Sequence, residues 1–422
     1  MRRSTESASQ HLYSKRHGFL AAILGPATIV SVAYIDPGNF GSNIAAGSRY
    51  GLNLLWVVWL SGLIAILYQY LSGKIGLATS KSVVDLVIES INKTPSRATR
   101  LAALYLYFIG LVAVILATDM AEFLGVVIGI YLLFKLPLTI ATLLGVLDVL
   151  VLMMISDQKI TLETVISSLV GIVGISLIYE SLVVGVDPVA VAEHSVLPTQ
   201  IDTGSLLLAV SILGATVMPH AVLLHSYLTA DKWSDAHKKE HMKKHVRDVI
   251  LNLSVASVIN ASIQIVSYYA FYRNGYHVID VESAYKILQP LYGENASLVF
   301  AVAILASGIS SSMVSILFAQ RSIESYLRKR LSSWRLRLYI RLLNMIPMII
   351  AIHLGISLLD ILVYTQAVLS LVLPVAIIPV LYFSSSREVL GEFRNNVYTE
   401  ISAFAGSIFI IGLNIYFLLQ SI

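Results

Sequence analysis

The chain has 422 residues, of which 57% are hydrophobic and 13% charged, and its mean hydropathy is +0.79. A soluble domain carries roughly 25% charged residues, so this composition excludes an ordinary water-soluble fold. The sequence contains no cysteine, which excludes disulfides, thiolate metal sites and cysteine nucleophiles. The net charge of +4 is modest, and we expect no nucleic-acid partner.

Hydrophobic stretches recur along the whole chain. A helix needs roughly 20 apolar residues to cross the hydrocarbon core of a bilayer. By this measure we predict an all-α integral membrane protein with eleven spans. They lie at about 19–47, 52–72, 100–130, 136–156, 160–184, 204–230, 246–272, 296–319, 335–354, 358–383 and 398–420.

The basic residues predict the orientation of these spans. If the N-terminus is cytoplasmic and the spans alternate, all but four of the 29 lysines and arginines fall on the cytoplasmic side. The exceptions are Arg49, Lys135, Arg273 and Lys286. Such asymmetry follows the positive-inside rule, which also supports the helix count. We therefore expect a multi-pass protein of the plasma membrane with a cytoplasmic N-terminus and an extracellular C-terminus.

Two spans carry a proline in a setting that breaks a helix. Pro37 follows Asp36 and precedes Gly38 and Asn39, and Pro219 lies between Met218 and His220. A proline frees the carbonyl four residues earlier and pushes the preceding residue out of the helical region. The freed carbonyls belong to Ala33 and Ala215. The alternative is a pair of structural kinks, but an Asp-Pro-Gly-Asn run in mid-span is hard to explain that way.

The two breaks fall in the first and sixth predicted spans. Breaks at corresponding positions of two halves indicate a transporter site between inverted repeats. We therefore predict two five-helix repeats with discontinuous helices 1 and 6. The expected segments are a cytoplasmic tail (1–18), the first repeat (19–184), an extracellular loop (185–203), the second repeat (204–383), and a cytoplasmic loop with the eleventh helix (384–422).

The breaks together offer a mixed set of metal ligands. Asp36 supplies a carboxylate, Asn39 an amide oxygen, Ala33 and Ala215 backbone carbonyls, and Met218 a thioether. Oxygen ligands suit hard cations, whereas a thioether favours softer ones. The set therefore favours Mn²⁺ and Fe²⁺, with Co²⁺ and Cd²⁺ as further candidates, over Mg²⁺ and Ca²⁺. The alternative for Met218 is apolar filling of the helix.

A second group of polar residues suggests protons. Asp119 and Glu122 share a face of the third span, His220 follows the second break, and Arg341 lies in the ninth span. Ionisable groups inside a membrane indicate either a proton relay or a buried ion-pair network that pins helices together. Both interpretations stay open, and they are compatible.

The motifs resemble those of the Nramp (natural resistance-associated macrophage protein) family. The similarity rests on Asp-Pro-Gly-Asn at 36–39, Ala-Thr-Val-Met-Pro-His at 215–220 and the acidic motif at 117–122, and extends through most of the chain. It implies a LeuT-type fold and proton-coupled import of Mn²⁺ or Fe²⁺. It also adds Gln366 to the metal ligands, and matches Asp119, Glu122, His220, His225 and Arg341 to the family's proton-pathway positions.

The sequence departs from the family pattern at three places. Ala221 replaces the usual asparagine after Met-Pro-His, Ile309 stands at the glutamine of the eighth span, and the paired arginines of the ninth span are reduced to Ile340-Arg341. These departures bear on proton coupling more than on metal binding. A related branch of the family transports Mg²⁺ with Met and Asn replaced, but this chain keeps both.

Other functions fit the composition less well. An amino-acid transporter on the same fold would not place Asp36 where a substrate carboxylate binds. A zinc metalloenzyme lacks its His-Glu-x-x-His motif, and a channel lacks a visible filter. A broad divalent-cation transporter that accepts Mg²⁺ without tight proton coupling remains the main alternative. We expect no enzymatic activity and no bound cofactor, with metal ions, protons and membrane lipid as the partners of a functional monomer.

Overall fold

The computed structural model describes residues 25–150, 184–199, 201–232, 238–276, 280–292 and 294–421, with the single positions 174, 176, 179 and 278. Over these residues the chain is helical, and the described part contains no strand. Eight of its helices are long and apolar enough to cross a membrane, and the shorter helical segments Pro26–Ile35 and Leu138–Leu150 are also apolar. The predicted span at 160–184 lies almost wholly outside the described residues, so the count of eleven stays a prediction.

The helices follow the predicted spans closely. The first span consists of α3 (Pro26–Ser31), η1 (Ala33–Ile35) and α4 (Pro37–Tyr50), and α5 is Leu55–Thr79, α7 Arg97–Phe134 and α8 Leu138–Gly145. The sixth span consists of α12 (Thr203–Thr216) and α13 (Pro219–Lys232), followed by α14 (Lys238–Ala270), α16 (Glu294–Leu327) and α17 (Ser333–His353). The last two spans consist of α18 (Leu358–Val372), α19 (Pro374–Ser385) and α21 (Val397–Ser421). Shorter elements between them are α6 (Val83–Asn92), α11 (Pro188–Val196), η3 (Tyr272–Asn274), α15 (Val281–Tyr292), α20 (Arg387–Leu390) and η4 (Gly391–Phe393).

The tenth predicted span is divided as well, which the sequence-based prediction did not include. Leu373 keeps helical dihedral angles between α18 and α19, with φ −55° and ψ −33°. Pro374 begins α19, where its missing N–H group is tolerated because the first turn of a helix lacks a partner for it. This division is a kink, in contrast to the extended backbone at Asp36.

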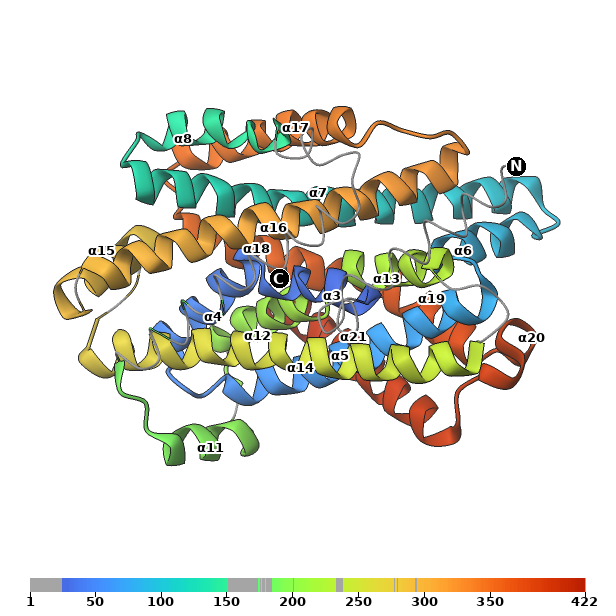
Figure 1. Ribbon diagram of the computed structural model, residues 1–422, viewed down its shortest axis with the longest axis horizontal. Helices are drawn as coiled ribbons and strands as arrows, with labels where there is room; N and C mark the ends of the chain where they lie inside the picture. Colours follow the sequence, from blue (N-terminus) through green and yellow to red (C-terminus); the bar gives the residue numbers. More distant parts are fainter. Residues whose placement is uncertain are drawn as a thin grey trace, which may run out of the picture.

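The two broken helices occupy the middle of the bundle. In Figure 1 the halves α3, α4, α12 and α13 lie between a layer that contains α7, α16 and α17 and a layer that contains α5 and α14. The packing agrees, because α4 contacts both α14 and α7, and α13 contacts both α5 and α16. The window of highest hydropathy in α12–α13 is 94% buried, whereas that of α7 is 22% buried. The broken helices are therefore the core, whereas α7 is exposed over its most apolar stretch and buried around Asp119 and Glu122.

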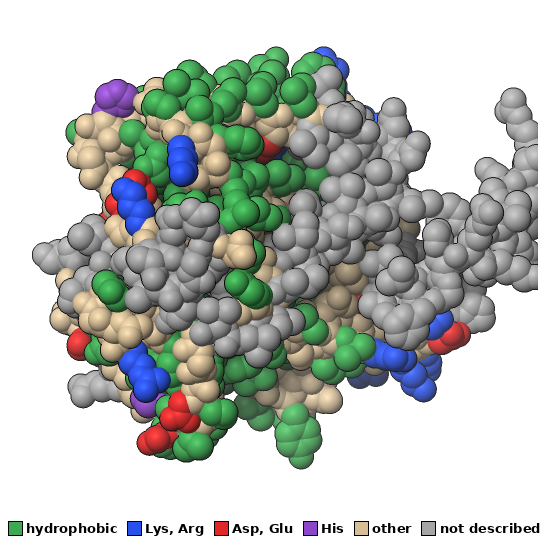
Figure 2. All heavy atoms as spheres, turned by 60° about the vertical axis from the view of Figure 1, so that its left-hand side comes forward, with side chains coloured by type: hydrophobic (Ala, Val, Ile, Leu, Met, Phe, Trp, Pro, Cys, Tyr) green, Lys and Arg blue, Asp and Glu red, His purple; other side chains and the backbone are tan. Residues whose placement is uncertain are grey.

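The outer surface is suited to lipid. Figure 2 shows hydrophobic side chains over much of the face that it draws. On α7 and α21 large apolar side chains point outward, and Leu106 is 73% exposed and Leu419 68% exposed. The 38 residues of α7 rise roughly 1.5 Å each, so this helix is longer than a hydrocarbon core of roughly 30 Å. It must tilt or project beyond the bilayer.

Candidate metal site

The first break opens where the sequence predicts it. After α3 the chain makes one short 3₁₀ turn at Ala33–Ile35, and Asp36 is extended, with φ −92° and ψ 166°. Pro37 then begins α4, and Asp36 becomes the N-cap of this helix, its Oδ1 accepting from the Asn39 N–H at 2.8 Å. Pro37 favours this unwinding, because a proline disfavours helical angles for the residue before it.

The second break lies at Val217 and Met218. The helix α12 ends at Thr216, and α13 begins at Pro219. The Val217 N–H still donates to the Leu213 carbonyl at 2.8 Å, so the chain leaves the helix only at Met218. Because Pro219 has no N–H group, the Ala215 carbonyl is left available for another donor.

The Asn39 side chain joins the two breaks. Its amide nitrogen donates to Asp36 Oδ1 at 2.9 Å and to the Ala215 carbonyl at 2.8 Å, and its oxygen accepts from the Thr216 hydroxyl at 3.3 Å. The amide hydrogens thus lie between two oxygens that the sequence predicts as metal ligands. A cation between the same oxygens would replace these hydrogen bonds, and Asn39 would offer its own oxygen after a half-turn of the amide.

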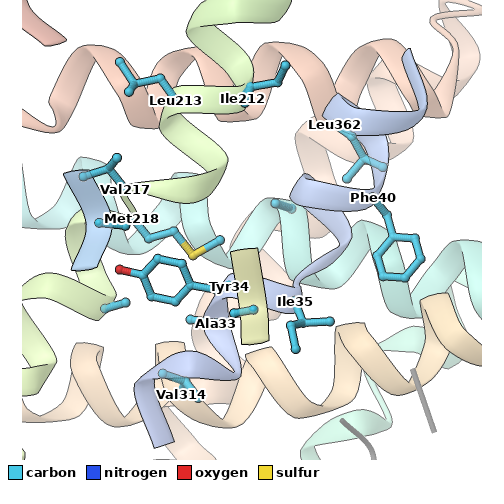
Figure 3. Packing of buried hydrophobic residues seen from close by; sticks show 14 of the residues in the cluster. Ala33, Tyr34, Ile35, Phe40, Ile212, Leu213, Val217, Met218, Val314 and Leu362 are labelled. Carbon is cyan, nitrogen blue, oxygen red and sulfur yellow. The ribbon is translucent and has the colours of Figure 1, made fainter. Parts of the chain in front are cut away.

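Met218 and Gln366 complete the surroundings of the breaks. Figure 3 draws the Met218 thioether beside Tyr34 and Ala33 of the first break, and Met218 is fully buried. Gln366 on α18 is also fully buried, and neither polar atom of its amide has a hydrogen-bond partner within the described part of the chain. It lies against Gly38, since a Cβ atom there would stand 1.7 Å from Gln366 Nε2. An unpartnered amide at this depth is suited to a ligand.

This site is enclosed and chemically mixed. Asp36 is 3% exposed, and Asn39, Ala33 and Ala215 are fully buried. Among the residues that the structure describes, no group of three His, Cys, Asp or Glu side chains is placed to hold a metal ion. Asp36 is the carboxylate among the predicted ligands at the breaks, and the full ligand set stays a prediction.

The polar residues of α7 form a buried ion-pair network with α17. Arg341 Nη1 lies 3.2 Å from Asp119 Oδ1, and its Nη2 lies 2.7 Å from Asp148 Oδ2. Arg337, one turn earlier, pairs with Asp119 at 3.0 Å and with Asp148 at 2.7 Å. Glu122 accepts from the Ser315 hydroxyl, and its second oxygen has no partner among the described residues.

Sequence reasoning missed Arg337. The family's paired arginines are reduced to Ile340-Arg341 in the sequence, but a second guanidinium group, that of Arg337, enters the network beside Arg341. Positions 337 and 341 are one helical turn apart and therefore share a face of α17. The i, i+4 spacing beside a cluster of acids was the signal that could have identified Arg337.

The two predicted proton-pathway histidines lie in different surroundings. His220 Nδ1 is 3.1 Å from the hydroxyl of Thr118, the neighbour of Asp119, so it connects the second break to α7. His225 instead lies 2.7 Å from Gln69 Oε1, and Gln69 donates to the Tyr34 hydroxyl at 2.8 Å. The structure therefore brings His220 towards the acidic network and places His225 with α5.

The architecture defines a class of protein. Two interrupted helices at the centre of a bundle of long apolar helices are the arrangement of LeuT-type membrane transporters. Mhp1, a nucleobase-cation-symport-1 family transporter, shares this fold with a TM-score of 0.60 at 12% identity, over 94% of this chain and 89% of its own.

Closer relatives identify the family. The family model described as natural resistance-associated macrophage protein-like (Nramp) matches residues 27–420. The divalent metal cation transporter MntH of Granulibacter bethesdensis is 37% identical over 99% of this chain and 93% of its own length. A manganese transporter of Eremococcus coleocola superposes with a TM-score of 0.83 at 27% identity, over 96% of this chain and 88% of that structure. The chain belongs to the Nramp family.

Proposed function

We propose that this protein imports Mn²⁺ and Fe²⁺ by alternating access, driven by protons. The observation that carries the proposal is the enclosed carboxylate of Asp36, held between both helix breaks with the Asn39 amide and the Ala215 carbonyl. Among the described residues Asp36 has hydrogen-bond partners but forms no ion pair with a basic side chain. Such a carboxylate is suited to a cation, because an unpaired charge at this depth is costly. The printed names of the relatives, a divalent metal cation transporter and a manganese transporter, support the same substrate class.

The thioether of Met218 supports selection among divalent cations. Mg²⁺ releases its water reluctantly and gains nothing from sulfur, whereas Mn²⁺ and Fe²⁺ accept mixed ligand sets. In the proposed cycle the metal sheds water onto Asp36, Asn39 and Met218, with the carbonyls of Ala33 and Ala215. Gln366, whose amide is unpartnered beside Gly38, joins as a further ligand.

The charge balance of the α7–α17 network supports proton coupling. Asp119, Glu122 and Asp148 face Arg337 and Arg341, and each of these side chains is at most 5% exposed. Three carboxylates beside two guanidinium groups leave one negative charge, which one proton neutralises. We assign that proton to Glu122 Oε1, the oxygen that has no hydrogen-bond partner among the described residues. His220, bonded to Thr118, lies between this network and the metal site.

The proposal is tested by Mn²⁺ uptake into proteoliposomes with excess Mg²⁺ or Ca²⁺ as competitor. Met218→Leu removes the sulfur and nearly conserves volume, so the fold should lose less than ~1.5 kcal/mol. We expect wild type to take up Mn²⁺ despite the competitor and Met218→Leu to lose that discrimination by tenfold or more. Met348→Leu, at a fully buried methionine of α17, is the matched control and should keep it.

Two outcomes would contradict the proposal. Equal competition by Mg²⁺ in wild type and Met218→Leu would indicate a broad divalent-cation transporter in which Met218 only packs. The second outcome is Mn²⁺ entry without acidification of the vesicle interior, which a pH indicator inside the same vesicles measures. It would exclude proton coupling while leaving metal transport intact.

A further inference from the structure

An acidic residue of α14 holds the beginning of the broken first helix. Asp248 Oδ2 accepts from the Ala27 N–H at 3.0 Å, across 221 positions in the sequence. Ala27 belongs to the first turn of α3, the short half of that helix. Figure 1 shows α3 in front of the middle of the bundle, and α3 packs against α13 and α14. Asp248 therefore acts as a helix cap that comes from a different helix.

The helix α3 depends on such a cap. It has six residues, too few to be stable on its own, so contacts with the rest of the bundle, this cap among them, hold it in place. Its own N-cap is Gly25, which has no side chain to accept a hydrogen bond, and Pro26 has no N–H group to offer. A carboxylate at a helix N-terminus both accepts the free N–H and meets the positive end of the helix dipole.

The surroundings of Asp248 are shaped for this contact. A Cβ atom on Gly25 would stand 1.9 Å from Asp248 Oδ2, so only glycine lets the carboxylate approach. On the other side, Asn252 Nδ2 donates to Asp248 Oδ1 at 2.8 Å and holds the carboxylate in place from the next turn of α14. The Asp248 carboxylate is therefore positioned from both sides, by the missing side chain at Gly25 and by the hydrogen bond from Asn252.

The opposite end of the broken helix has a contact of another kind. Arg49, in the last turn of α4, pairs with Asp360 in the first turn of α18 at 3.0 Å. Both side chains are 34% exposed, and ion pairs at such exposure contribute little. This pair gives a comparison for Asp248, because it ties the same broken helix to the bundle at its far end.

We propose that Asp248 is a latch that holds α3 against α14 and closes the path to Asp36 from that side. It is a positioning residue for the transport cycle, and the proposal rests on the alternating-access function proposed above. Release of the Ala27 N–H and the Gly25 backbone from Asp248 would free α3 to move away from α14. The distribution of basic residues puts this end of the molecule in the cytoplasm, so the latch closes the inner side.

Hydrogen–deuterium exchange of the full chain in detergent, without metal, tests the latch. In Asp248→Ala we expect the amides of residues 26–36 to exchange roughly five to ten times faster, the effect of a lost helix cap. Exchange in α7 and α16 should stay unchanged. Asp360→Asn is the matched control and should leave the exchange of residues 26–36 as in wild type, because the exposed pair that it removes contributes little.

A second variant, at Gly25, disturbs the contact between Asp248 and the beginning of α3 without changing Asp248 itself. Gly25→Ala keeps Asp248 but forces it away, so it should reproduce the faster exchange. Because both changes remove one contact, the double variant Gly25→Ala/Asp248→Ala should exchange no faster than either single variant. In Mn²⁺ uptake the latch variants should raise the apparent KM for external metal severalfold, since fewer molecules are closed on the inner side.

Two results would overturn the latch. Unchanged exchange of residues 26–36 in both Asp248→Ala and Gly25→Ala would show that α3 is held by other contacts. Faster exchange spread equally over α7 and α16 would make Asp248 a residue of general stability. Failure of the proposed function is distinguishable, because wild type would then not take up Mn²⁺ whatever the exchange of α3 shows.

Discussion

At the scale of single residues, the close approach of Gly38 to the Gln366 amide shapes the candidate site. Gly38 follows Pro37 in the first break, and the space that a side chain would occupy is filled by the Gln366 amide and by Asp36 Oδ2, 2.8 Å from the ideal Cβ position. Gly38 lies in the first turn of α4 and has no positive φ, so the glycine is needed for the close contact with α18 and not for an unusual backbone.

Gly38→Ala should disturb the site without removing any ligand. The added methyl group must displace Gln366 and shift Asp36, which we expect to lower Mn²⁺ uptake by tenfold or more and stability by about 1–3 kcal/mol. Uptake into proteoliposomes and the unfolding midpoint in detergent measure the two effects.

Gly412→Ala in α21 is the control for this change. No atom lies within 4 Å of the Cβ position at Gly412, so this variant should behave as wild type. Uptake by Gly38→Ala at the wild-type rate would mean that Gln366 and Asp36 do not need their present positions.

At the scale of secondary-structure elements, Arg337 and Arg341 of α17 hold distant segments together. Arg337 and Arg341 each pair with a carboxylate of α7 and with Asp148, which follows α8, so they tie together three segments that are distant in the sequence. A buried ion pair is weak evidence for net stability, but removal of one partner leaves an uncompensated charge. The network is therefore sensitive to single substitutions.

Arg337→Leu should lower the free energy of unfolding by about 3–5 kcal/mol, because Asp148 and Asp119 then lose a cationic partner in a buried place. Thermal unfolding in detergent measures the loss. Arg335→Leu, at an exposed position two residues earlier on the same helix, is the control and should change stability by less than about 0.5 kcal/mol. Equal midpoints for the two variants would show that Arg337 is not essential to the network.

The orientation in the membrane is a property of the whole molecule and remains a prediction from the basic residues. The chain has no cysteine, so a single introduced cysteine reports its own position. A membrane-impermeant maleimide applied to intact cells should label Ala192→Cys, in the predicted extracellular loop. It should label Lys329→Cys only after permeabilisation, and both residues are exposed. Labelling in the reverse order would invert the predicted topology.

At the same scale, the sequence by itself determined the class of fold and the places of both breaks. Apolar runs of membrane length allow few structures other than helices, and Pro37 and Pro219 favour breaks in those helices through local sterics. Pro347 and Pro379 lie inside α17 and α19, so a proline marks a place where a helix can break and the surrounding residues decide whether it does. At Asp36 the backbone is extended as predicted.

Only the tertiary structure decided which side chains meet. The Asn39 amide bridges Asp36 and the Ala215 carbonyl, Arg337 enters the network of Arg341, and Asp248 caps α3. His225 lies with Gln69 on α5, away from the acids with which the resemblance grouped it. These contacts join helices that are distant in the sequence, and no local pattern specifies how such helices rotate and approach one another, because packing of the whole bundle sets both.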